Sequence, residues 1–286
     1  MAAPFSDRAR RIPAEVGSLL CVGLDPDPER IPRSVGPGAS ARTLRRFLDG
    51  VVGATRPFAS AYKFQLASYF SYGADGFDVL EETVRAIGPD RIRILDLKAN
   101  DIPNTMRLYH DGIFDRFGFD AITVTPWIGW DSLGPFTDDP THGVYVVAHS
   151  SNPGWRSLQG RRSSGPPAWI EVLNRVRALA RRSHNVGAVV GATYPAAVAE
   201  ARRHLGDGVP LLVPGVGAQR GALERCVRAG IDRGRRSLLI NASRSILYAS
   251  GGAGWARACA IEAERLNSKI EAARSVATRT ARRPAA

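Results

Sequence analysis

Lysine is nearly absent from this chain. Of the 39 basic residues among its 286, three are lysines: Lys63, Lys98 and Lys269. Arginine stays protonated, whereas lysine is a compact charge whose pKa can be tuned and which can release a proton. The few lysines are therefore candidates for positions where arginine would not serve. Lys63 and Lys98 fall at the ends of consecutive predicted strands, and Lys269 lies near the C-terminus.

Cysteines and long apolar runs are also scarce. The three cysteines, Cys21, Cys226 and Cys259, are far apart and form no CxxC pair. This pattern indicates a reducing compartment without a disulfide framework. No apolar run approaches the roughly 18 residues that span a membrane, and the first residues lack the apolar core of a signal peptide. We expect a cytoplasmic protein with no membrane partner.

Zinc-binding histidine pairs and a nucleic-acid signature are missing too. The five histidines form no HxH or HExxH pair, which argues against a dedicated zinc site. The net charge of +12 raises nucleic-acid binding as an alternative. However, the arginines are scattered, and the densest late run, 274–283, has no interleaved aromatic residue to stack on bases. We expect no nucleic-acid partner.

Eight apolar segments alternate with helical segments over about 250 residues. Expected strands cover about 19–25, 59–65, 91–98, 121–125, 143–149, 186–191, 209–213 and 237–240. Expected helices cover about 6–16, 41–55, 104–117, 167–182, 195–205, 222–229 and 253–273, and another ends near 87. This rhythm predicts an α/β protein, a (β/α)₈ TIM barrel. A doubly wound sheet is the alternative, but the turn after the first strand reads DPDPER and lacks the glycine fingerprint. We expect one domain over 1–286, with flexible tails at about 1–5 and 274–286.

The stretch 91–105, RIRILDLKANDIPNT, changes from an apolar strand into a cluster of charge. Asp96 and Lys98 are two residues apart, so on a strand both point to the same side. Asp101 follows where the strand should become a loop. Buried charges are costly unless they pair. The cluster is either a structural ion pair at the barrel end or a proton-transfer site, in which the two carboxylates keep Lys98 protonated.

The loops after the last two strands resemble a phosphate site. The first reads PGVGAQRG from Pro214 and the second NASR from Asn241. Glycines allow backbone N–H groups to approach an anion, Gln219 can donate hydrogen bonds, and Arg244 can bind a phosphate in a bidentate manner. These two loops form the usual phosphate site of TIM barrels. A plain tight turn is the alternative for the glycine-rich loop.

The motif D-x-K-x-x-D-I-x-x-T resembles the signature of the orotidine 5′-phosphate decarboxylases. Its residues here are Asp96, Lys98, Asp101, Ile102 and Thr105. The resemblance extends to the strand-one aspartate, the AYKFQ lysine, PGVGAQ and NASR, and the NASRSI and SSNPG segments are similar to the longer bacterial (type 2) subfamily. It implies a carboxy-lyase that converts orotidine 5′-monophosphate to UMP and CO₂, the last step of de novo UMP synthesis, without metal or organic cofactor.

The resemblance also implies residue roles around the substrate. Lys98 would protonate C6 of the pyrimidine, and Asp96 would stress the substrate carboxylate. Asp25 and Lys63 would hold the ribose hydroxyls, with Lys63 also in the charge network. Ser151 would contact the pyrimidine amide edge, and Ser150 is the alternative because the serine is doubled.

The remaining implied roles concern the phosphate and the partner subunit. Pro214, Gln219 and Arg244 would line the phosphate end of the site. Asp101, Ile102 and Thr105 would reach into the site of a second subunit, which makes the enzyme a homodimer.

A sister activity is the main enzymatic alternative. Hexulose-6-phosphate synthase is a magnesium-dependent aldolase with a similar D-x-K-x-x-D run. The combination of PGVGAQ and NASR argues against it. The arginine-rich segment 155–167 could be a lid or a mobile excursion, and we favour the excursion.

Overall fold

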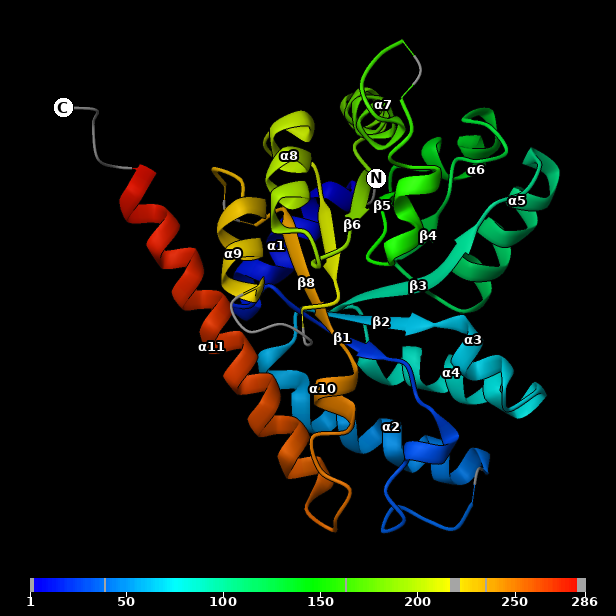
Figure 1. Cartoon of the computed structure of the whole chain (residues 1–286). Coiled ribbons are helices and arrows are strands. Elements are labelled where there is room, and N and C mark those ends of the chain that lie inside the picture. The colour runs from blue at the N-terminus through cyan, green and yellow to red at the C-terminus, as the bar shows by residue number, and fades with distance from the viewer. Residues whose placement is uncertain (1–2, 39, 163, 217–221, 235, 282–286) are drawn as a thin grey trace.

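Eight parallel strands close into a barrel in chain order, with β1 pairing both β2 and β8. The computed structural model describes residues 3–38, 40–162, 164–216, 222–234 and 236–281. The strands are β1 (Leu20–Leu24), β2 (Ala61–Gln65), β3 (Ile92–Ala99), β4 (Ala121–Val124), β5 (Gly143–His149), β6 (Val186–Val190), β7 (Leu211–Pro214) and β8 (Leu238–Ala242). The predicted (β/α)₈ barrel is confirmed (Figure 1).

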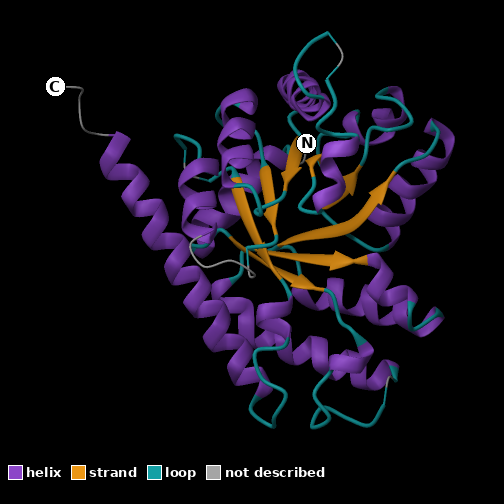
Figure 2. Cartoon of the chain, in the orientation of Figure 1, coloured by secondary structure: helices purple, strands orange, loops and turns teal. Residues whose placement is uncertain are grey.

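Helices surround the barrel, as Figure 2 shows. They are α1 (Phe5–Val16), α2 (Ala41–Thr55), α3 (Leu66–Phe70), α4 (Ala74–Ile87), α5 (Pro103–His110), α6 (Gly134–Thr137), α7 (Ala168–Ser183), α8 (Pro195–Leu205), α9 (Ala222–Gly230), α10 (Arg244–Leu247) and α11 (Trp255–Ala281). Short 3₁₀ helices are η1 (Pro28–Arg30), η2 (Arg56–Phe58), η4 (Asp131–Leu133) and η5 (Pro153–Ser157), and the π-helical η3 (Asp111–Arg116) continues α5.

The strands alternate between the barrel interior and the helical layer. In β2, Tyr62 and Phe64 pack in the large core between strands and helices, whereas Ala61 belongs to a separate interior cluster. Lys63 and Gln65 follow Ala61 with the same two-residue period and line a cavity. The interior side of a strand therefore changes from apolar to polar toward its C-terminal end.

Helix α1 closes the N-terminal end of the barrel. Phe5 and Ile12 are almost fully buried in the interior cluster, and the Phe5 ring meets Tyr145 of β5 edge-on at 5.9 Å between centroids. Phe5 thus lies in a packed helix, and the expected flexible segment at 1–5 is wrong at this residue.

The predicted end of the last helix at 273 was wrong, since α11 continues to Ala281. Its buried face includes Ile270 and Ala273, which are at most 3% exposed. Alanine and arginine are strong helix formers, and Arg274 pairs with Glu271 one turn earlier. We attribute the extra turns to these local preferences, which the sequence interpretation underweighted.

No helix in the described ranges is long and apolar enough to cross a membrane.

Asp120 joins α1 to the barrel. Its buried carboxylate accepts hydrogen bonds from the Arg93 Nε and Nη2 atoms at 2.7 and 2.8 Å, and from the Arg93 backbone N–H at 2.8 Å. The Arg8 guanidinium of α1 pairs with the same carboxylate. The Asp120 carboxylate thus pairs with two guanidinium groups, that of Arg8 on α1 and that of Arg93 on β3.

We expect Asp120→Ala to lower the free energy of unfolding by about 3 kcal/mol, because two partly buried guanidinium groups lose their partner. Asp49→Ala, which removes an exposed pair with Arg45 on α2, should cost at most about 1 kcal/mol. Urea unfolding of both variants would measure the difference. Equal costs would show that the Asp120 network does not anchor α1.

Candidate active site

A cavity of about 750 Å³ opens at the C-terminal ends of the strands. Its lining combines residues from the ends of β1, β2, β3, β7 and β8 with loop residues that follow several strands. The lining residues are Asp25, Arg30, Lys63, Gln65, Asp96, Ser151, Pro214, Gly215, Val216, Asn241, Ala242, Ser243, Arg244 and Ser245. Six predicted site residues are among them: Asp25, Lys63, Asp96, Ser151, Pro214 and Arg244.

Asp96 lies between the two lysines that the sequence singles out. Its Oδ2 is 2.8 Å from the Lys63 Nζ and its Oδ1 is 2.6 Å from the Lys98 Nζ. The Thr123 hydroxyl of β4 donates a third hydrogen bond to Oδ1 at 2.8 Å. Burial alone would raise the pKa of Asp96, but Lys63 and Lys98 outweigh burial and lower it to about 2. The carboxylate is therefore charged at neutral pH.

Lys63 is the buried member of the network. It is 3% exposed, and its Nζ also lies 3.5 Å from Asp25 Oδ1, which in turn accepts a hydrogen bond from the Gln65 backbone N–H. Burial would lower the pKa of Lys63, but Asp25 and Asp96 together raise it above the ordinary value. Lys63 is a fixed cation between two carboxylates.

Lys98 differs from Lys63 in exposure and in backbone conformation. Its side chain is 48% exposed, and Asp96 is its one ion-pair partner among the described residues. Its φ of 56° lies in the left-handed region, where the β3–β4 register shifts between Leu95 and Ala99. Its N–H donates to the Thr123 hydroxyl at 3.0 Å. Left-handed backbone in a non-glycine residue costs roughly 1–2 kcal/mol and is often found at functional sites.

Asp101, Ile102 and Thr105 stand apart from the cavity within one chain. The Asp101 carboxylate accepts a hydrogen bond from the Ile102 N–H at 2.8 Å, and over the described ranges it forms no ion pair with Lys98. The Ile102 side chain is 56% exposed, and Thr105 lies in the first turn of α5. The sequence interpretation expected Lys98 to lie between Asp96 and Asp101. Within one chain this expectation is wrong, because only the Asp96 carboxylate forms an ion pair with Lys98 among the described residues.

The loops after β7 and β8 meet on one side of the cavity. Pro214 ends β7, and Gly215 and Val216 follow it. Ser243 follows β8, and Arg244 and Ser245 begin α10. Gly215 has φ of 96°, a conformation that favours glycine. The predicted residue Gln219 lies outside the described residues.

Arg30, Gln65 and Thr123 were missed by the sequence interpretation. Arg30 ends η1 after β1, and its guanidinium stacks on the Tyr248 ring at 3.9 Å. Arg30 lies in the loop after the first strand, and this position could have identified it as a site residue, because the active sites of TIM barrels are built from such loops. Thr123 is the last residue but one of the apolar strand β4, and no sequence pattern marks its contact with Asp96.

Ser151 and not Ser150 lines the cavity. The Ser150 N–H donates to the Gln159 side chain at 2.9 Å, and the Trp155 ring lies 4.2 Å from His149, so the start of segment 155–167 is packed against the barrel. The prediction that segment 155–167 is a mobile excursion is thus wrong for Trp155 and Gln159. Buried His149 packs among aromatic rings.

Known proteins are similar to this chain in sequence and fold. A sequence model of the orotidine 5′-phosphate decarboxylase / HUMPS family matches residues 18–259. Orotidine 5′-phosphate decarboxylase of Thermomicrobium roseum is 40% identical over 269 residues, 93% of this chain and 95% of that protein. Its counterpart in Verminephrobacter eiseniae is 38% identical over 275 residues, 94% and 99% of the two chains. The structure of Leishmania donovani OMP decarboxylase superposes with a TM-score of 0.83 at 31% identity, covering 96% of this chain and 99% of that one. The resemblance seen in the D-x-K-x-x-D-I-x-x-T motif is thus confirmed over nearly the whole length, and the chain belongs to the orotidine 5′-phosphate decarboxylase / HUMPS family.

Proposed function

We propose that this chain decarboxylates orotidine 5′-monophosphate to UMP and CO₂, the last step of de novo UMP synthesis. The observation that carries this function is the chain of alternating charge from Asp25 through Lys63 and Asp96 to Lys98 beside the cavity. The relatives named above are orotidine 5′-phosphate decarboxylases. The arginines at the cavity supply the cationic groups that a phosphate ester requires.

Asp96 and Lys98 perform the chemical step in this proposal. The charged Asp96 carboxylate repels the substrate carboxylate, which favours its loss as neutral CO₂. The C6–carboxyl bond breaks and its electron pair stays on C6. Lys98 stabilises the developing charge and then donates a proton from its ammonium to C6. Lys98 regains a proton from solvent, so the sum is substrate plus one proton giving UMP and CO₂.

The two lysines are suited to different tasks. Lys63 is buried and clamped by two carboxylates, so it is a poor proton donor but a firm support for Asp96. Lys98 is half-exposed with one carboxylate partner, which leaves its ammonium able to reach a substrate. Asp25 and Lys63 together present a carboxylate and an ammonium to the ribose hydroxyls.

The opposite side of the cavity binds the rest of the nucleotide. Arg244 and Pro214 bind the phosphate in this proposal, together with Gln219, which lies outside the described residues. Arg30 adds a second guanidinium to the cavity wall. Ser151 contacts the amide edge of the pyrimidine. The positive potential of Arg30 and Arg244 also draws in a doubly charged ester.

Two copies of the chain form a homodimer through the face that carries the ends of β3 and β4. Trp127 is 73% exposed, and the hydrogen bond from the Ile128 N–H to Asn100 Oδ1 (3.1 Å) holds its loop beside the loop of Ile102. Other exposed apolar side chains nearby on α5 are Leu108 and Tyr109. We assign these exposed apolar side chains to the dimer contact, because apolar patches on a surface mark protein interaction sites. Asp101, Ile102 and Thr105 then extend into the partner's cavity.

The magnesium-dependent aldolase is the second candidate, since the family name covers both activities. A magnesium ion needs free carboxylate oxygens. Here Lys63 contacts both Asp25 and Asp96, and Lys98 contacts the other Asp96 oxygen. This pairing favours the decarboxylase.

Lys98→Arg should lower kcat for UMP formation by at least about 10³-fold, because arginine keeps the charge but does not release a proton. Lys269→Arg, which alters a half-exposed side chain of α11 outside the cavity lining, should leave kcat unchanged. Circular dichroism would show that both variants fold. Turnover close to the wild-type value in folded Lys98→Arg would exclude Lys98 as the proton donor.

The shared site predicts complementation between two inactive variants. Lys98→Ala and Asp101→Ala proteins, mixed and allowed to exchange subunits, form hybrid dimers with one intact site each. Random exchange should restore about one quarter of wild-type activity. Exchange demonstrated by mass spectrometry without recovered activity would show that Asp101 serves its own subunit.

A further inference from the structure

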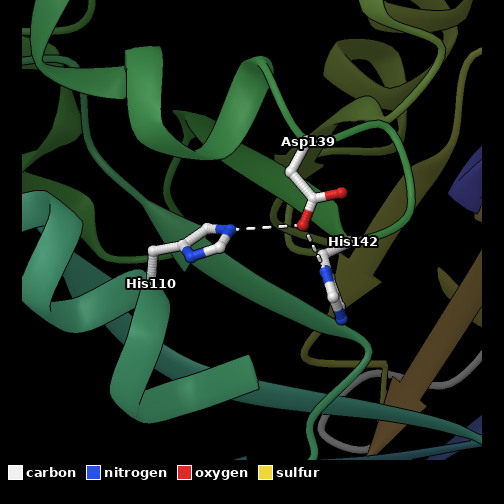
Figure 3. Close-up of side chains that lie close together, drawn as sticks. All are labelled: His110, Asp139 and His142. Carbon is white, nitrogen blue, oxygen red and sulfur yellow. Dashed lines mark hydrogen bonds and ion pairs between the residues drawn. The ribbon is translucent and has the colours of Figure 1, made fainter. Parts of the chain in front are cut away.

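Two histidines and an aspartate converge at the end of the barrel opposite the cavity. His110 ends α5, and Asp139 and His142 belong to the loop between α6 and β5 (Figure 3). Asp139 Oδ2 lies 3.2 Å from the His110 Nε2 and 2.6 Å from the His142 Nδ1. The three possible ligand atoms all lie within 4.8 Å of one another. Figure 3 shows both rings turned toward the same carboxylate.

Outer contacts hold these side chains in place. The other ring nitrogen of His110, Nδ1, lies 3.2 Å from Asp111 Oδ1. The other carboxylate oxygen of Asp139, Oδ1, accepts hydrogen bonds from the Thr141 hydroxyl at 2.6 Å and from the Thr141 N–H at 3.0 Å. Metal-binding histidines usually donate their second N–H to a carboxylate, and metal-binding carboxylates are themselves hydrogen-bonded.

The surrounding packing makes the cluster rigid. The Phe114 ring stacks on His142 at 4.1 Å with an interplanar angle of 10° and meets His110 edge-on at 5.0 Å. The buried Asn185 amide donates to three backbone carbonyls, those of Phe136, Asp139 and His142, and so fixes the loop. The three ligand side chains are 17–26% exposed, so an ion could still enter from solvent.

We propose that His110, Asp139 and His142 form a binding site for a divalent transition-metal ion, best matched by Zn²⁺. Two imidazole nitrogens and one carboxylate oxygen are a recurrent donor set for this ion, with solvent in the fourth position. Tetrahedral ligands at zinc distances lie about 3.3 Å apart. The His110–Asp139 separation already agrees, and the His142–Asp139 separation has to open by several tenths of an ångström.

The ion would act on the fold and not on the reaction. The site precedes β5 and so lies at the N-terminal end of the barrel, where α1 also docks: the Phe5 N–H donates to the Pro140 carbonyl at 2.7 Å. A bound ion joins the end of α5 to this loop. The sequence interpretation dismissed zinc because no HxH or HExxH pair exists, but the ligands here come from two separate elements.

The test is Zn²⁺ titration of the full-length, tag-free protein after EDTA treatment and dialysis, by competition with a chromogenic chelator. We expect one equivalent per chain and, with Co²⁺, the visible absorption of a tetrahedral site. Asp111→Asn should weaken binding about tenfold, and His110→Gln and His142→Gln should weaken it more. His204→Gln is the matched control, because His204 contacts one carboxylate, Glu200, outside the cluster.

Each outcome decides the proposal. Saturable binding that His204→Gln retains and the cluster variants lose would support it, and Zn²⁺ should then raise the Tm of the wild type but not of His142→Gln. Absence of saturable binding, or binding that folded His110→Gln and His142→Gln retain, would overturn it and leave a hydrogen-bonded trio. If His142→Gln does not fold, His110→Gln and Asp111→Asn carry the same comparison.

Discussion

The Asp96 carboxylate, shared by two lysines, is the constraint on which the active end of this barrel depends. A buried carboxylate is stable when its desolvation is offset by nearby cations and hydrogen bonds. Lys63 and Lys98 provide the cations and Thr123 the hydrogen bond. The same contacts leave Asp96 charged at neutral pH, and this charge is what the proposed reaction needs next to a second carboxylate. The Asp96 carboxylate therefore both stabilises this end of the barrel and, in the proposed reaction, repels the substrate carboxylate.

The barrel geometry explains how these groups meet. Because side chains alternate along a parallel strand, a two-residue step takes β2 from Ala61 to Lys63 on the interior side. The corresponding step in β3 leads from Ile94 to Asp96. The next step fails to follow the regular pattern, since Lys98 has left-handed backbone and the register with β4 shifts there. This irregularity leaves Lys98 half-exposed while its ammonium still reaches Asp96.

The sequence was sufficient for the fold and for most of the charge network. Apolar strands of regular spacing predicted the barrel, and the scarcity of lysine pointed to Lys63 and Lys98. It could not predict the irregularity at Lys98, whose backbone N–H donates to the Thr123 hydroxyl of another strand. The separation of Asp101 from Lys98 was missed for a related reason: proximity in sequence says little once a strand has turned into a loop.

The C-terminal end of the barrel carries the reactive groups, and decarboxylation is the reaction that they support. The direct measurement is the loss of the orotate chromophore after orotidine 5′-monophosphate is added to wild-type protein in EDTA, with UMP quantified by chromatography. We expect rapid loss of the chromophore and one UMP formed per substrate consumed, without added metal. Folded, dimeric protein that leaves the substrate unchanged, and that acts on sugar phosphates when Mg²⁺ is supplied, would contradict it.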